Sequence, residues 1–142
     1  MNTPEHGTAN RLIETVYLDE GITVKIFDAS KKLPADRWQI TLAARLEIPI
    51  EALYREKPEK LPPAEDLRAA LDDPLIYEHK DVRQFIDANE KTTVFESLRK
   101  NFTERVLPHI AKPRFHVNYA AMTYREYTKR QTWYPDEKEP KS

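Results

Sequence analysis

The amino-acid sequence predicts an α+β fold, in which an N-terminal three-stranded antiparallel meander packs against C-terminal helices. Two patterns carry this prediction: apolar residues alternate at period two over much of 11–48, and they recur at helical intervals over 93–107. The chain has 142 residues, the size of one typical domain. We therefore expect a single α+β domain over 10–134, between a disordered lead-in at 1–9 and a flexible tail at 135–142.

The first two strands are expected over residues 11–18 and 22–27. Between them lies the turn Asp19-Glu20-Gly21, in which glycine is free to take a positive φ. In the second strand, every other residue is apolar and belongs to one face: Ile22, Val24 and Ile26. The pattern predicts a hairpin.

The third strand, Arg37–Ile48, has the clearest pattern in the sequence. Its apolar face comprises Trp38, Ile40, Leu42, Ala44, Leu46 and Ile48. Its polar face comprises Arg37, Gln39, Thr41, Arg45 and Glu47, with Ala43 among them. The period of two throughout predicts a strand with one face in the core. The polar connection before it, Asp28–Asp36, is long for a hairpin and is a candidate functional loop.

Helices are expected after the meander. A short helix is predicted to start at Pro63 and to end before Pro74, and a second is predicted over Lys80–Asn89 with Val82, Phe85 and Ile86 on one face. Thr93 and Glu96 have the spacing of a capping box. The apolar stripe behind them predicts a helix up to Pro108: Phe95, Leu98, Phe102 and Val106.

The segment 114–131 fits two structures. Phe115, Val117 and Tyr119 alternate as in a strand, whereas 120–131 fits a helix. The sequence leaves this choice open.

Composition excludes several classes of function. The formal net charge is only −1, so the chain as a whole has no field that attracts nucleic acid or anionic membranes. There is no cysteine, hence no disulfide and no thiolate ligand or nucleophile. With two glycines, the chain has no glycine-rich phosphate loop, and we expect no cofactor. No apolar run resembles a signal peptide or membrane helix, so we expect a soluble, cytoplasmic protein.

The basic and aromatic segment 112–134 is the candidate binding region. It has five basic residues against one acid, interleaved with aromatic rings, a pattern that suits single-stranded nucleic acid or a nucleotide. The candidate ligand-binding residues are Arg114, Tyr119, Tyr124, Arg125, Tyr127, Lys129 and Arg130. The alternative is that the rings belong to the core or to a dimer interface. The segment 51–90, with eleven acids and six bases, offers an internal or inter-subunit partner for these cations.

Neither a metal site nor a catalytic centre is predicted. His79, His109 and His116, with Glu78 and Asp81, lack the spacing of a metal motif, and we expect no metal. No serine lies in a nucleophile elbow, although an enzyme site built from scattered residues such as Arg37, His79 and Tyr119 is an open alternative.

The function that the sequence favours is a non-enzymatic protein-interaction or regulatory module. The expected partner is a second copy of the chain, in a homodimer, or another protein. Open sheet edges and surplus aromatic residues are commonly covered in this way. The alternative function is a nucleic-acid or nucleotide binder acting through 112–134.

Overall fold

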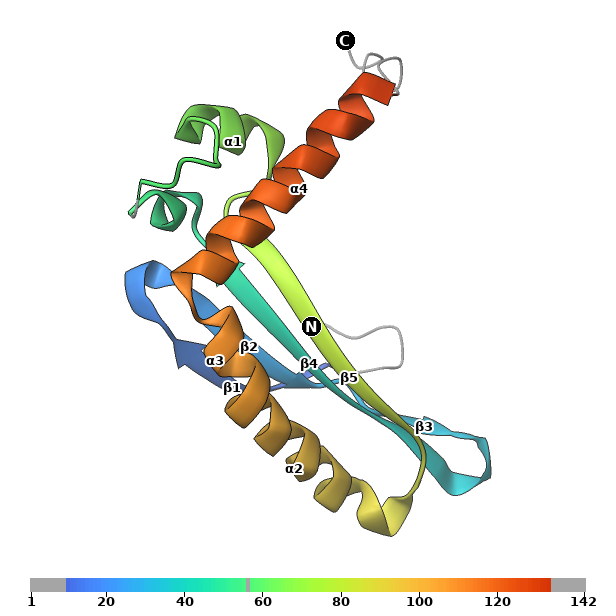
Figure 1. Ribbon diagram of the computed structural model, residues 1–142. Coiled ribbons are helices and arrows are strands. Elements are labelled where there is room, and N and C mark those ends of the chain that lie inside the picture. Colours follow the sequence, from blue (N-terminus) through green and yellow to red (C-terminus); the bar gives the residue numbers. More distant parts are fainter. Residues whose placement is uncertain (1–9, 56, 134–142) are drawn as a thin grey trace.

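The computed structural model describes residues 10–55 and 57–133 (Figure 1). The lead-in expected at 1–9 and the tail expected at 135–142 lie outside these residues. The strands and helices are β1 Arg11–Tyr17, β2 Thr23–Asp28, β3 Lys31–Leu33, β4 Arg37–Ile48, α1 Ala64–Ala70, β5 Leu75–Asp87, α2 Lys91–Asn101, α3 Leu107–Ile110 and α4 Pro113–Trp133. The predicted α+β class, an antiparallel sheet followed by helices, is confirmed.

The sheet is antiparallel, with β4 at its centre. β2 pairs with one half of β4 and β3 with the other half of the same edge, while β1 lies outside β2. β5 pairs with the opposite edge of β4 along its whole length. The predicted meander is therefore present as β1, β2 and β4, and β3 and β5 extend it. The tight turn of the first hairpin relies on Gly21, whose φ is +79°.

The core forms where one face of β4 meets the helices. From Ile40 to Ile48 every second residue of β4 is at most 3% exposed, as the alternation predicts. Figure 1 shows α2 and α3 lying along one side of the sheet. Their buried contributions are Phe95, Leu98, Phe102 and Ile110. Removing these apolar surfaces from water stabilises the fold by about 1.5–3 kcal/mol for each large side chain.

The other face of β4 carries charged side chains, which form ion pairs with side chains of the neighbouring strands. Glu47 lies 3.3 Å from Lys25 of β2, and Arg45 lies 3.7 Å from Glu78 of β5. Arg37, at the start of the strand, pairs with Asp87. These partly exposed pairs fit a face in contact with water, as antiparallel sheets commonly have.

The prediction of a helix over Lys80–Asn89 is wrong, because residues 80–87 belong to β5 and the strand ends in a 3-10 turn, Ala88–Glu90. Two residues of β5, Gln84 and Phe85, oppose one residue of β4 between the pairs Arg83–Ile40 and Ile86–Trp38. Phe85 lies inside this bulge with a φ of +54°. The extra residue breaks the period of two and gives Val82, Phe85 and Ile86 a spacing that resembles a helix face.

The predicted helix from Thr93 is confirmed in its buried stripe but not in its cap. α2 begins at Lys91, so Thr93 lies inside the first turn, and no side chain of the described residues caps the helix. Beyond α2 the chain makes a π-helical turn over Phe102–Val106, and α3 then continues past Pro108. The wide turn shifts the hydrogen-bonding pattern just before proline, which has no N–H to donate.

The other two helices are α1 and α4. α1 follows Pro63 as predicted and buries Leu67 completely. The sequence left open whether 114–131 is strand or helix. It is helix, because α4 spans the whole segment. Its buried residues, His116 and Ala120, lie four apart, so they share one side of a helix. Figure 1 shows the second half of α4 extending beyond the sheet.

Candidate functional site

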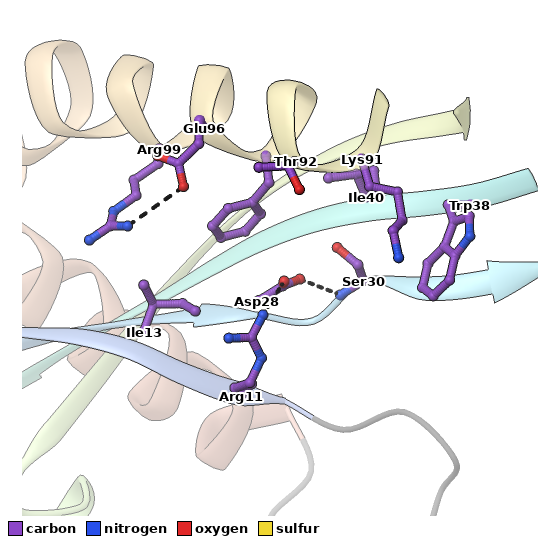
Figure 2. Close-up of a pocket in the computed structure, with 11 residues that line it drawn as sticks. Arg11, Ile13, Asp28, Ser30, Trp38, Ile40, Lys91, Thr92, Glu96 and Arg99 are labelled. Atoms are coloured by element: carbon purple, nitrogen blue, oxygen red, sulfur yellow. Dashed lines mark hydrogen bonds and ion pairs between the residues drawn. The ribbon is translucent and has the colours of Figure 1, made fainter. Parts of the chain in front are cut away.

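An open cleft of about 540 Å³ lies between the sheet and the first turns of α2. Figure 2 shows Arg11, Asp28 and Ser30 on the sheet side of this cleft and Lys91, Thr92, Glu96 and Arg99 on the α2 side. The apolar and aromatic part of its lining is Ile13, Trp38, Ile40 and Phe95. Ala29 and Ser30 connect β2 to β3. The Asp28–Asp36 connection, which the sequence predicts as a candidate functional loop, therefore supplies part of this lining.

Three cations enter the cleft, each beside a partner in the protein. Arg11 lies 3.1 Å from Asp28, across the β1–β2 pair. Arg99 lies 2.9 Å from Glu14 and 3.8 Å from Glu96. The Nζ atom of Lys91 lies 3.7 Å from the centre of the Trp38 ring, which is cation–π distance.

Ser30 is held so that its hydroxyl proton is free for a ligand. Its Oγ accepts a hydrogen bond from the backbone N–H of Thr41 at 3.0 Å, and its own N–H donates to Asp28 at 3.0 Å. Because a hydroxyl can accept and donate at once, the Oγ–H can still donate to an acceptor in the cleft. One bond is local to the β2–β3 connection and the other comes from β4, so the serine is positioned by the sheet itself.

The cleft brings charged, hydroxyl and aromatic groups together. Among the described residues that line it, Asp28 and Glu96 add two carboxylates, and the Asp28 carboxylate accepts the N–H of Ser30. Cations, a hydroxyl and an indole ring together fit an anionic ligand that carries a flat ring. Burial lowers the pKa of His116 and raises the pKa of Tyr54, and neither residue lines the cleft.

The seven candidate residues predicted on 112–134 all lie on α4, but on two of its sides. Arg114 lines a groove with Pro58 and Lys60, and Arg125 with Tyr124 lines the next hollow along that side. Residues 114 and 125 are eleven apart, close to three full turns, and so share a side. Lys129 is exposed.

The remaining three residues face the start of β5 and the end of α1. Tyr127 and Arg130 line a hollow with Leu71, and Tyr119 belongs to the same hollow. The Tyr119 hydroxyl donates a 2.9 Å hydrogen bond to the carbonyl oxygen of Ile76. The ring of Tyr119 packs edge-on against that of Tyr77, with 5.1 Å between the ring centroids. Tyr119 therefore holds α4 to the sheet. The structure thus spreads the seven residues over two sides of α4, which meet where the rings of Tyr124 and Tyr127 stack with their centroids 6.4 Å apart.

The basic segment and the acidic segment 51–90 are neighbours in the fold. α1, from the acidic segment, contacts α4. Lys60 donates a 2.7 Å hydrogen bond to Asn118. Part of the basic segment is therefore covered within the same chain.

The free edge of β5 is the second candidate site. β4 occupies one edge of β5, and no strand of the described chain pairs with the other. Two of the large apolar side chains that remain exposed lie on this strand, Val82 and Phe85, the latter 71% exposed. An unpaired edge with exposed apolar side chains is a typical site of strand addition.

Sequence reasoning missed Arg11, Lys91 and Arg99, which come from β1 and α2 and meet only in the fold. The polar Asp28–Asp36 connection was the one signal that pointed to this cleft. The edge of β5 was missed because its segment was predicted as a helix.

Comparison with known proteins adds no assignment. No family model, no curated protein and no solved structure matches this chain. Within the described ranges, no cluster of three or more His, Cys, Asp or Glu residues is arranged to hold a metal ion. Nor does that part of the chain contain a helix long and apolar enough to cross a membrane.

Proposed function

We propose that this chain is a non-enzymatic interaction module that acts as a homo-oligomer in the cytoplasm. The observation that carries the proposal is the unpaired edge of β5, a thirteen-residue strand that pairs with β4 alone among the described strands. A cysteine-free composition suits a reducing compartment.

Two further features support association through this side of the molecule. Val82 and Phe85 expose apolar surface on the edge strand, and burying it against another chain removes it from water. The positive φ of Phe85 is unfavourable for a side chain of this size, and such strain is commonly retained at functional positions. The second chain is the simplest partner, since closed symmetric pairs are the commonest oligomers.

Sedimentation equilibrium of the full chain at micromolar concentration tests the proposal. We expect a mass well above that of the 16.7 kDa monomer, rising with concentration. A strict monomer over the whole concentration range would rule out self-association.

The cleft favours a second function, binding of a nucleotide-like anion. Lys91 on the Trp38 ring, Arg11 and the Ser30 hydroxyl supply a stacking surface, positive charge and a donor within one cavity. The nucleotide-binding alternative therefore stays a proposal, but its proposed site is the cleft between β1, β2 and α2 rather than the surface of α4.

Titration calorimetry with purine nucleotides distinguishes the two locations. We expect salt-sensitive binding that Arg11→Gln weakens about tenfold, the effect of one charged contact. Arg114→Gln on α4 is the matched control and should bind as the parent does. The reverse ranking would assign binding to α4, and no saturable heat with the parent chain would remove the nucleotide function.

A further inference from the structure

The charges on β5 are complementary to those of a second β5 strand. Glu78 and Lys80 are two apart on the strand, so they point to the same face of the sheet, and both are exposed. When two copies of the strand run antiparallel about a two-fold axis at His79, each Glu78 lies opposite Lys80 of the other copy. Opposite charges directly across an antiparallel pair are stabilising.

We propose that two copies of this chain dimerise by pairing β5 with β5, in the register that places His79 on the two-fold axis. This inference rests on the proposed self-association and specifies its interface. The pairing joins the two sheets into one continuous sheet, with the helices of both copies on the same side. It also covers the free strand edge, which proteins otherwise protect with charge or with another element.

The backbone of β5 is arranged for this pairing. The carbonyl of Ile76 accepts the Tyr119 hydroxyl, which marks Ile76 as a residue whose carbonyl is directed away from β4. Backbone groups alternate between the two edges of an antiparallel strand. The N–H and C=O groups of Glu78, Lys80 and Val82 are therefore directed to the free edge, where the second strand can bind them.

The charges also select one register. Sliding the second strand by two residues in one direction places Glu78 opposite Glu78, and sliding it in the other direction places Lys80 opposite Lys80. Like charges in direct opposition are destabilising, so both neighbouring registers are disfavoured. In the favoured register Val82, which is 39% exposed, lies opposite Ile76 and forms an apolar pair at each end.

His79 gives an independent reason to place the axis at its position. Its Nε2 atom is buried and has no hydrogen-bond partner in the described part of the chain. Such an atom needs explanation, because buried polar groups are nearly always paired. On the axis, Cα atoms of directly opposed residues are about 4.5 Å apart, which brings a second imidazole, able to donate or accept, beside the first.

Charge reversal provides the test, read by sedimentation equilibrium of the full chain. Glu78→Lys alone and Lys80→Glu alone each place two like-charged pairs in the interface. We expect each variant to raise the dimer dissociation constant about tenfold or more. A one-to-one mixture of the two variants restores both opposite-charge pairs and should dimerise as the parent does. The double variant, Glu78→Lys with Lys80→Glu, should dimerise with itself.

Controls separate this inference from the function on which it rests. Lys100→Glu, an exposed reversal on α2, should leave the dissociation constant unchanged. A parent chain that is monomeric overturns both proposals. A dimeric parent whose β5 variants remain equally dimeric overturns the β5 interface and leaves self-association standing. Rescue in the mixture also shows that the single variants are folded.

Cross-linking reads the register directly, because the chain has no cysteine of its own. Directly opposed residues of a hydrogen-bonded pair have Cα atoms about 5.5 Å apart, within the range that a disulfide spans. On mild oxidation, Glu78→Cys mixed with Lys80→Cys should give the mixed disulfide in higher yield than either variant gives alone. Efficient self-cross-linking of a Val82→Cys variant would instead place the axis at Val82 and overturn the register.

Discussion

At the scale of single residues, His116 is the clearest case of a buried polar side chain that the fold must satisfy. It is 4% exposed, and its Nε2 lies 2.8 Å from the carbonyl oxygen of Ile110. Since a carbonyl only accepts, Nε2 carries the proton of the neutral ring. This bond ties the first turn of α4 to the end of α3.

Stability should depend on pH through this residue. Burial lowers the pKa of His116, so below about pH 6.5, the usual histidine pKa, the unfolded chain takes up a proton that the folded chain resists. The contribution of His116 is thus complete above that pH and is lost as the pH falls further. We expect urea unfolding to show a smaller free energy at about pH 5.5 than at about pH 7.5.

Variants isolate the histidine responsible. His116→Gln keeps a donor for Ile110 but does not titrate, so the difference between the two pH values should shrink. His109→Gln, at an exposed position of α3, should retain the parent's difference. An unchanged difference in His116→Gln would assign the pH dependence to other groups.

At the scale of elements, β4 is where sequence and structure agree best. Its bounds, Arg37–Ile48, and its buried face follow from alternation alone, because a central strand with one face in the core leaves that pattern in the sequence. The same reasoning failed at β5. There the bulge at Phe85 interrupts the period, and the edge position leaves most side chains exposed. The cleft could not be derived, because its cations lie on elements far apart in sequence.

Two neighbouring residues of β4 test its two faces. Leu46 is 1% exposed, and Leu46→Ala should lower the free energy of unfolding by about 2–5 kcal/mol, since it leaves a cavity in the core. Arg45 has a 40% exposed side chain and a 3.7 Å contact with Glu78. Arg45→Ala should cost less than about 1 kcal/mol. Equal losses in chemical denaturation would contradict the assignment of the faces.

The start of α2 offers a second test. A capping box at Thr93 would make Thr93→Ala cost about 1 kcal/mol. In the structure Thr93 is exposed inside the first turn and caps nothing, so we expect a change within about 0.5 kcal/mol. Leu98→Ala, which removes a buried side chain of the same helix, shows that the denaturation assay detects a real loss. A loss of about 1 kcal/mol in Thr93→Ala would restore the predicted cap.

At the scale of the whole molecule, two parts of the chain compete for the role of interface: the edge of β5 and the protruding half of α4. The first half of α4 belongs to the core, through His116 and Ala120, and its Tyr119 is bonded to the sheet. The second half lies beyond the sheet in Figure 1. Removing residues 128–142 therefore separates the two roles and leaves every residue of β5 in place.

We expect the chain that ends at Tyr127 to unfold with a free energy within about 1 kcal/mol of the parent, because the buried residues described on α4, His116 and Ala120, precede the cut. Its dimer dissociation constant should also be unchanged, since the proposed pairing uses only β5. A chain that ends at Pro113 is the control and should lose the cooperative transition, because it lacks the buried half of α4. A truncated chain that folds normally but sediments as a monomer would instead assign the interface to α4.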